Sequence, residues 1–107
     1  QESTFIQDDV VESKTKLPSL TDEAKILLKE ASKDRHGTIM HLRHLGGTDV
    51  QTNGKNFIES NERREVARWE SAIEELTSKD LVADPGYKGE IYEITNLGYQ
   101  IADMIQL

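Results

Sequence analysis

The sequence predicts an α+β domain in which helices pack with small antiparallel β-hairpins. Two segments, 21–35 and 61–80, place apolar residues at the spacing of a helix face, whereas segment 38–58 carries a hairpin turn between strand-like runs. A length of 107 residues fits one domain. Leu, Ile, Val and Phe make up about a quarter of the chain, above the roughly 20% below which chains tend to stay disordered. We therefore expect a single hydrophobic core built from both kinds of element.

The chain begins with a polar, acidic stretch, residues 1–19, which we interpret as a linker or N-terminal arm. The domain itself is expected to span 20–107. A few apolar residues within the arm could dock as a short strand or helix, so an ordered arm is the alternative. An opening of this kind is expected of a domain cut from a larger protein, and the alternative is a small free-standing protein with a floppy arm.

The first helix is predicted over 21–35. Thr21 is a suitable N-cap, and the acidic Asp22 and Glu23 fall in the first turn, where the helix dipole favours negative charge. Gly37 is a suitable stop signal. The residues expected to face the core are Ala24, Leu27, Leu28 and Ala31.

Strands are predicted over 38–58. The dipeptide Asn53-Gly54 is typical of a type I′ hairpin turn. A two-residue turn would pair Thr52 with Lys55 and Val50 with Phe57. The run Thr38–Leu45 would form the preceding strand, ended by Gly46-Gly47, although a helix over 38–45 is an alternative.

A second helix is predicted over 61–80, with Ser60 or Asn61 as its N-cap. Its core face would consist of Val66, Trp69, Ala72, Ile73 and Leu76.

After a short apolar run at 81–83 and turn residues at 84–89, a strand is predicted over 90–95. Thr95 is expected to cap a last helix. The residues expected to point inward from that helix are Leu97, Ile101, Met104 and Ile105.

The run WESAIEELTSKDLVADPGYKGEIYEITNLGYQIAD resembles the recognition helix, wing and closing helix of winged-helix domains. The matching features are Leu76, Leu81-Val82, the Tyr87–Gly89 tip and the T-x-x-G run Thr95-Asn96-Leu97-Gly98. The resemblance covers roughly 61–105, and it implies that 21–35 is the family's first helix and 61–80 its recognition helix. The segment 37–58 departs from the family, because it offers a hairpin where a second helix is usual. The chain is in this respect similar to C-terminal modules of uncharacterised bacterial multi-domain proteins.

The overall charge disfavours nucleic acid as a partner. The net charge is −7, and phosphate contacts by Lys and Arg supply most of the non-specific affinity for DNA. Helix 61–80 carries glutamates among its arginines, whereas bases are usually read by Arg, Lys, Asn or Gln. Only segment 33–58 is basic over more than one helix length, with four Lys and Arg against two Asp.

Eight residues are candidates for contact with a partner or with DNA: Arg43, His44, Lys55, Arg63, Arg64, Arg68, Tyr87 and Lys88. In a strand, His41 and Arg43 share one face and His44 the other, so an anion or an acidic partner could bind there. Each candidate surface has a plainer alternative. Segment 38–58 would be an ordinary exposed hairpin, Tyr87-Lys88 a plain turn, and helix 61–80 a solvated face with internal pairs such as Glu65 with Arg68.

The sequence lacks the common motifs of enzyme active sites. There is no cysteine, and no G-x-S-x-G, P-loop or H-E-x-x-H motif, so we expect no enzymatic activity and no cofactor. His41 and His44 would converge only on a helix, and two histidines rarely suffice for zinc, so no metal site is expected. No apolar run approaches the roughly 18 residues of a membrane helix. We expect a cytoplasmic protein without membrane insertion.

These observations favour a non-enzymatic interaction or regulatory module within a larger bacterial protein. A protein partner is expected, or self-association through 96–107. The alternative is the DNA-binding domain of a transcriptional regulator, which the winged-helix resemblance implies by analogy.

Overall fold

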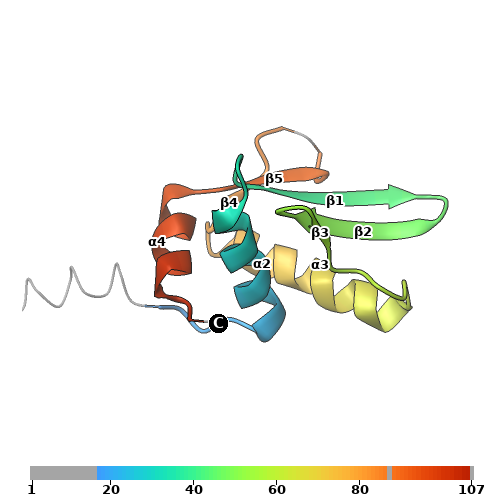
Figure 1. Ribbon diagram of the computed structural model, residues 1–107, viewed down its shortest axis with the longest axis horizontal. Helices are drawn as coiled ribbons and strands as arrows, with labels where there is room; N and C mark the ends of the chain where they lie inside the picture. The colour runs from blue at the N-terminus through green and yellow to red at the C-terminus, as the bar shows by residue number, and fades with distance from the viewer. Residues whose placement is uncertain (1–16, 87, 107) are drawn as a thin grey trace, which may run out of the picture.

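The computed structural model describes residues 17–86 and 88–106, in which three helices lie on one side of a five-stranded antiparallel sheet (Figure 1). The helices are α2 (Asp22–Lys33), α3 (Arg63–Ser78) and α4 (Asn96–Met104). The strands are β1 (Thr38–His44), β2 (Gly47–Thr52), β3 (Lys55–Asn56), β4 (Val82–Ala83) and β5 (Ile91–Ile94). The predicted α+β class is confirmed. The predicted arm lies outside the described residues except for 17–19, where Leu17 packs against the core.

Helix α2 forms as predicted and ends two residues early. The Thr21 hydroxyl accepts a hydrogen bond from the backbone N–H of Ala24 at 3.3 Å, and the four predicted core residues are fully buried. Asp34 follows the helix, and its carboxylate accepts the backbone N–H groups of His36, Thr38 and Asn53. Burial raises the pKa of Asp34, but these hydrogen bonds outweigh it and leave the pKa below its usual value. Asp34 thus ties α2 to both ends of the hairpin.

The segment after α2 is a hairpin, which excludes the alternative of a helix over 38–45. Asn53 and Gly54 have φ values of 54° and 76°, as a type I′ turn requires, and Thr52 pairs with Lys55 as predicted. The Phe57 N–H donates to the Val50 carbonyl at 2.9 Å, which continues the predicted register.

The two hairpins form one sheet, which the sequence left open. Strands β1 and β5 are antiparallel neighbours, with Ile39 opposite Tyr92 and Met40 opposite Ile91. The strand order is β3-β2-β1-β5-β4, so β1 is the central strand between β2 and β5, and two-residue strands form the borders. Along β1, Ile39 and His41 are buried against the helices, which follows from the alternation of side chains in a strand.

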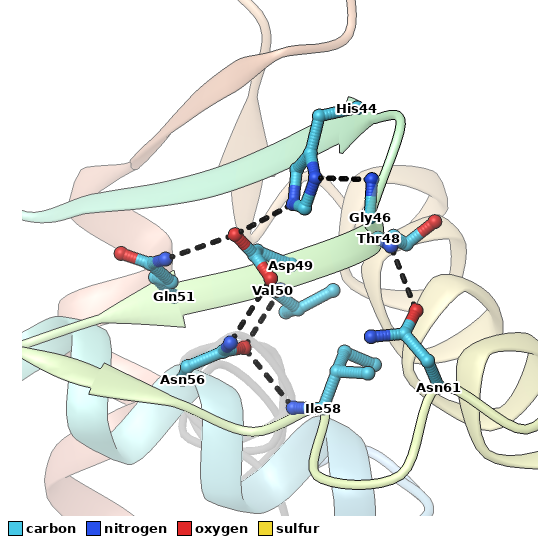
Figure 2. Close-up of polar contacts among 9 residues, drawn as sticks. All are labelled: His44, Gly46, Thr48, Asp49, Val50, Gln51, Asn56, Ile58 and Asn61. Atoms are coloured by element: carbon cyan, nitrogen blue, oxygen red, sulfur yellow. Dashed lines mark hydrogen bonds and ion pairs between the residues drawn. The ribbon is translucent and has the colours of Figure 1, made fainter.

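The outer side of β2 is covered mainly by side chains rather than by a strand. The Asn61 Oδ1 accepts the backbone N–H of Thr48 at 2.7 Å, and the Asn56 Oδ1 accepts that of Val50 at 3.3 Å (Figure 2). The same Asn56 oxygen accepts the N–H of Ile58 at 3.1 Å. Two amides therefore satisfy backbone groups that a neighbouring strand would otherwise pair.

The predicted N-cap of the second helix is wrong. Helix α3 begins after Glu62, which makes no side-chain cap, whereas the Glu65 carboxylate accepts the backbone N–H groups of Glu59, Ser60 and Asn61. These hydrogen bonds lower the pKa of Glu65 to about 2. Glu65 therefore fixes the segment that leads into α3 and does not cap the N–H groups of the helix itself. The predicted core face is confirmed, with Val66 only half-buried and Trp69, Ala72, Ile73 and Leu76 buried.

Helix α4 is capped as predicted, but two of its inward residues are wrong. The Thr95 hydroxyl accepts the Gly98 N–H at 2.9 Å, and Ile101 and Ile105 are buried. Leu97 and Met104 are instead 36% and 38% exposed. The buried face consists of Gly98, Ile101, Ala102 and Ile105, because small residues let the helix approach the strands closely.

Candidate functional site

Two adjoining hollows lie between α3 and the neighbouring strands β1 and β5, and we call them together the α3 groove. Their volumes are about 620 and 320 Å³, and both are lined by Ser71, Ile73, Glu74 and Tyr92. At one end the groove is completed by His41, Arg43, Ala67 and Glu70, and at the other by Glu75, Thr77 and Ser78. Residues of β1, α3 and β5 therefore meet there because β1 and β5 are paired and α3 lies beside them.

A polar cluster closes one end of the α3 groove. The Glu70 Oε2 lies 2.8 Å from the His41 Nε2 and accepts a hydrogen bond of 3.1 Å from the Arg43 guanidinium. His41 is only 7% exposed, whereas Arg43 is exposed to solvent. The cluster links β1 to α3, and the Glu70 carboxylate is therefore already bound by residues of the domain itself.

The middle of the groove combines an aromatic ring with a carboxylate. Tyr92 is half-buried, and burial raises the pKa of its phenol, with a further rise from the negative charge of Asp84 and a smaller one from Glu74. Arg43 opposes these effects. Glu74 is exposed and makes no hydrogen bond or ion pair with the described residues, so its carboxylate is available in the groove.

Three of the predicted contact residues face carboxylates of the domain itself. Arg43 pairs with Glu70 at 3.1 Å, and Lys55 pairs with Glu30 at 3.3 Å. The Arg68 guanidinium lies 3.5 Å from the Glu23 carboxylate of α2. This pair replaces the expected contact of Arg68 with Glu65, because Glu65 is engaged by the backbone before α3.

The remaining predicted contacts are spread over the surface. Arg63 and Arg64 are exposed in the first turn of α3, and Lys88 is exposed in the loop between β4 and β5. None of the three forms an ion pair with the residues that the structure describes. Tyr87 lies outside the described residues.

His44 belongs to a network at the far end of the hairpin (Figure 2). Its Nε2 lies 3.1 Å from the Asp49 Oδ2, and its Nδ1 accepts the Gly46 N–H at 3.1 Å. The other Asp49 oxygen accepts from the Asn56 amide at 3.0 Å. The network fixes the β1–β2 turn. Over residues 17–86 and 88–106, no group of three or more His, Asp and Glu side chains could hold a metal ion.

Sequence reasoning did not assemble the α3 groove. It placed His41 and Arg43 on one strand face, which is confirmed by their shared contact with Glu70. The sequence offered a solvated face of helix 61–80 as an alternative and placed Tyr92 only within the predicted strand 90–95. The signal that joins them is the pairing of β1 with β5, and no local pattern indicates that pairing.

No helix among the described residues is both long and apolar enough to cross a membrane. Neither a protein-family model nor a curated protein nor a solved structure matches the chain. The geometry and charge of the described surface are therefore what a functional proposal must rest on.

Proposed function

We propose that the domain is a non-enzymatic protein-interaction module with a winged-helix-like organisation, serving a regulatory role within a larger bacterial protein. The observation that carries the proposal is the pairing of Arg43, Lys55 and Arg68 with carboxylates of the same domain. A DNA-binding surface needs such cations for phosphates, because contacts to phosphate supply most of the affinity.

The order of the elements supports the winged-helix part of the proposal. Helix α3 is followed by the β4–β5 hairpin and by the Thr95-capped α4, as the recognition helix, wing and closing helix would be. In the place of the usual second helix the chain has strands β2 and β3. A face of α3 that carries Glu70, Glu74 and Glu75 suits a protein partner better than a phosphate backbone.

DNA binding is the second candidate, and Arg63, Arg64 and Lys88 favour it because they lack ion pairs with the described residues. Fluorescence anisotropy of a labelled generic DNA duplex, at about 50 mM and about 200 mM salt, separates the two candidates. We expect no binding by the wild-type domain up to about 100 µM, the weak end of ordinary non-specific affinity. Binding that falls steeply with salt would overturn the proposal.

A pair of variants tests the reason for the absence of binding. Glu23→Gln with Glu70→Gln frees Arg68 and Arg43, and this variant should gain weak, salt-dependent binding to DNA. The matched control, Glu59→Gln with Glu62→Gln, changes the net charge equally at exposed side chains that make no ion pair with the described residues. An equal gain in the control would show that net charge, rather than internal pairing, governs DNA binding.

A further inference from the structure

We infer that the α3 groove binds a segment of a partner protein that carries arginine or lysine side chains, an inference that rests on the proposed interaction function. The groove has the three features that such a side chain requires. It has an apolar floor for the aliphatic stem, an aromatic ring, and a carboxylate without a partner among the described residues.

The floor is formed where both hollows meet. Ile73 lines both of them and is itself buried, and the half-buried Tyr92 of β5 faces the same space. Long basic side chains bury their methylene stems on apolar surface while the charged group stays at the rim. The exposed side of an aromatic ring also attracts a cation, more strongly where water is partly excluded.

The charges around the floor are unequal. Glu70, Glu74 and Glu75 line the groove, and Arg43 is the single Lys or Arg among the lining residues. Glu70 already binds His41 and Arg43, and Glu75 accepts hydrogen bonds from the backbone and hydroxyl of Thr21 at 3.0 and 2.7 Å. The Glu74 carboxylate makes no hydrogen bond or ion pair with the described residues and can therefore pair with a cation of the partner.

The shape favours a chain segment as the occupant. The two hollows share lining residues and follow α3 from Ala67 to Ser78, about three turns of helix. An extended peptide of four or five residues would cover that length. The negative charge repels a phosphate backbone and attracts a basic peptide, so charge complementarity selects the latter.

The test uses two acetylated and amidated pentapeptides, Leu-Arg-Leu-Arg-Gly and the matched Leu-Gln-Leu-Gln-Gly. Each is titrated into the ¹⁵N-labelled domain, and the amide shifts are followed by NMR. We expect the arginine peptide to shift amides of residues 70–78 and 91–94 and the glutamine peptide to shift them much less. Glu74→Gln should weaken the arginine peptide about fivefold, the upper end for a solvent-exposed ion pair. Because the Glu74 side chain is exposed and makes no hydrogen bond or ion pair with the described residues, this variant should fold normally.

Glu62→Gln is the control, since it removes the same charge from an exposed side chain of the segment before α3 and outside the groove. It should leave binding of the arginine peptide unchanged. Three results would each overturn the inference: equal shifts from both peptides, equal weakening by both variants, or no shifts at about 10 mM peptide. The last is decisive because about 10 mM exceeds the millimolar dissociation constants of weak recognition. If the arginine peptide gives one of these results and the wild-type domain does not bind DNA, the inference is refuted but the proposed function is not. Salt-dependent DNA binding by the wild type would instead refute the proposed function.

Discussion

Replacing Gly98 by alanine should destabilise the domain, although alanine is the better helix former. Gly98 lies in α4, and a Cβ atom added there would collide with the backbone carbonyl oxygen of Leu81 and lie 2.7 Å from the Ile94 Cγ1. A backbone atom cannot rotate away as a flexible side chain can. Helix α4 must therefore move outward, or β4 must shift.

The expected loss is about 2 kcal/mol. Overpacking in a rigid core costs roughly 1–3 kcal/mol. The shift would also strain the hydrogen bond that the Thr95 N–H donates to the Leu81 oxygen at 3.0 Å, worth about 1 kcal/mol. Against this, Gly to Ala gains about 1 kcal/mol in helix propensity. The net loss corresponds to a fall in Tm of roughly 10 °C for a domain of this size.

Urea unfolding, followed by far-ultraviolet circular dichroism and by the emission of the single tryptophan, measures the effect. Trp69 reports on the core because it is 9% exposed and packs against Phe57, with ring centroids 5.0 Å apart. Gln100→Ala, at an exposed position of the same helix, is the control and should change stability little. A Gly98→Ala variant as stable as the wild type, or more stable, would refute the close approach of α4 to Leu81.

Three further changes test other parts of the fold. Because the pKa of Glu65 falls to about 2 on folding, its contribution is complete above pH 4.5 and is lost as the pH falls toward 2, so Glu65→Gln should flatten the loss of stability in acid urea titrations. An unchanged acid slope would contradict this. Thr52→Val should cost about 1 kcal/mol in chemical denaturation, because the buried hydroxyl donates to the Thr38 carbonyl at 2.7 Å; a neutral result would exclude that role. Asn61→Gly, which keeps the φ of 60° accessible, should speed hydrogen exchange of the Thr48 amide about five- to tenfold, and unaltered exchange would show that its hydrogen bond is unimportant.

The parts of the fold that the sequence predicts well depend on neighbours a few residues apart. Thr21 and Thr95 each accept a hydrogen bond from the backbone N–H three residues later, and Asn53-Gly54 turns the chain within two residues. Such signals need no knowledge of the rest of the molecule. The helices and the first hairpin are accordingly found close to their predicted positions.

The parts that the sequence does not predict depend on distant partners or on close packing. His41 meets Glu70 across 29 positions, and Arg68 prefers Glu23 to its helix neighbour Glu65. The face of α4 was misassigned because large apolar residues dominate the pattern, whereas the actual contact requires the small Gly98. The α3 groove depends on the pairing of β1 with β5, so its lining could not be assembled from local patterns.

The side-chain amides along the outer side of β2 have a consequence for how copies of this domain meet one another. An unpaired strand border is a template on which other chains add strands, and such growth leads to aggregates. Here Asn56 and Asn61 occupy two backbone donors of β2 from the side, so an approaching strand would have to displace both amides before it could bind. The two asparagines that organise the hairpin therefore also disfavour the pairing of β2 with a strand of another copy.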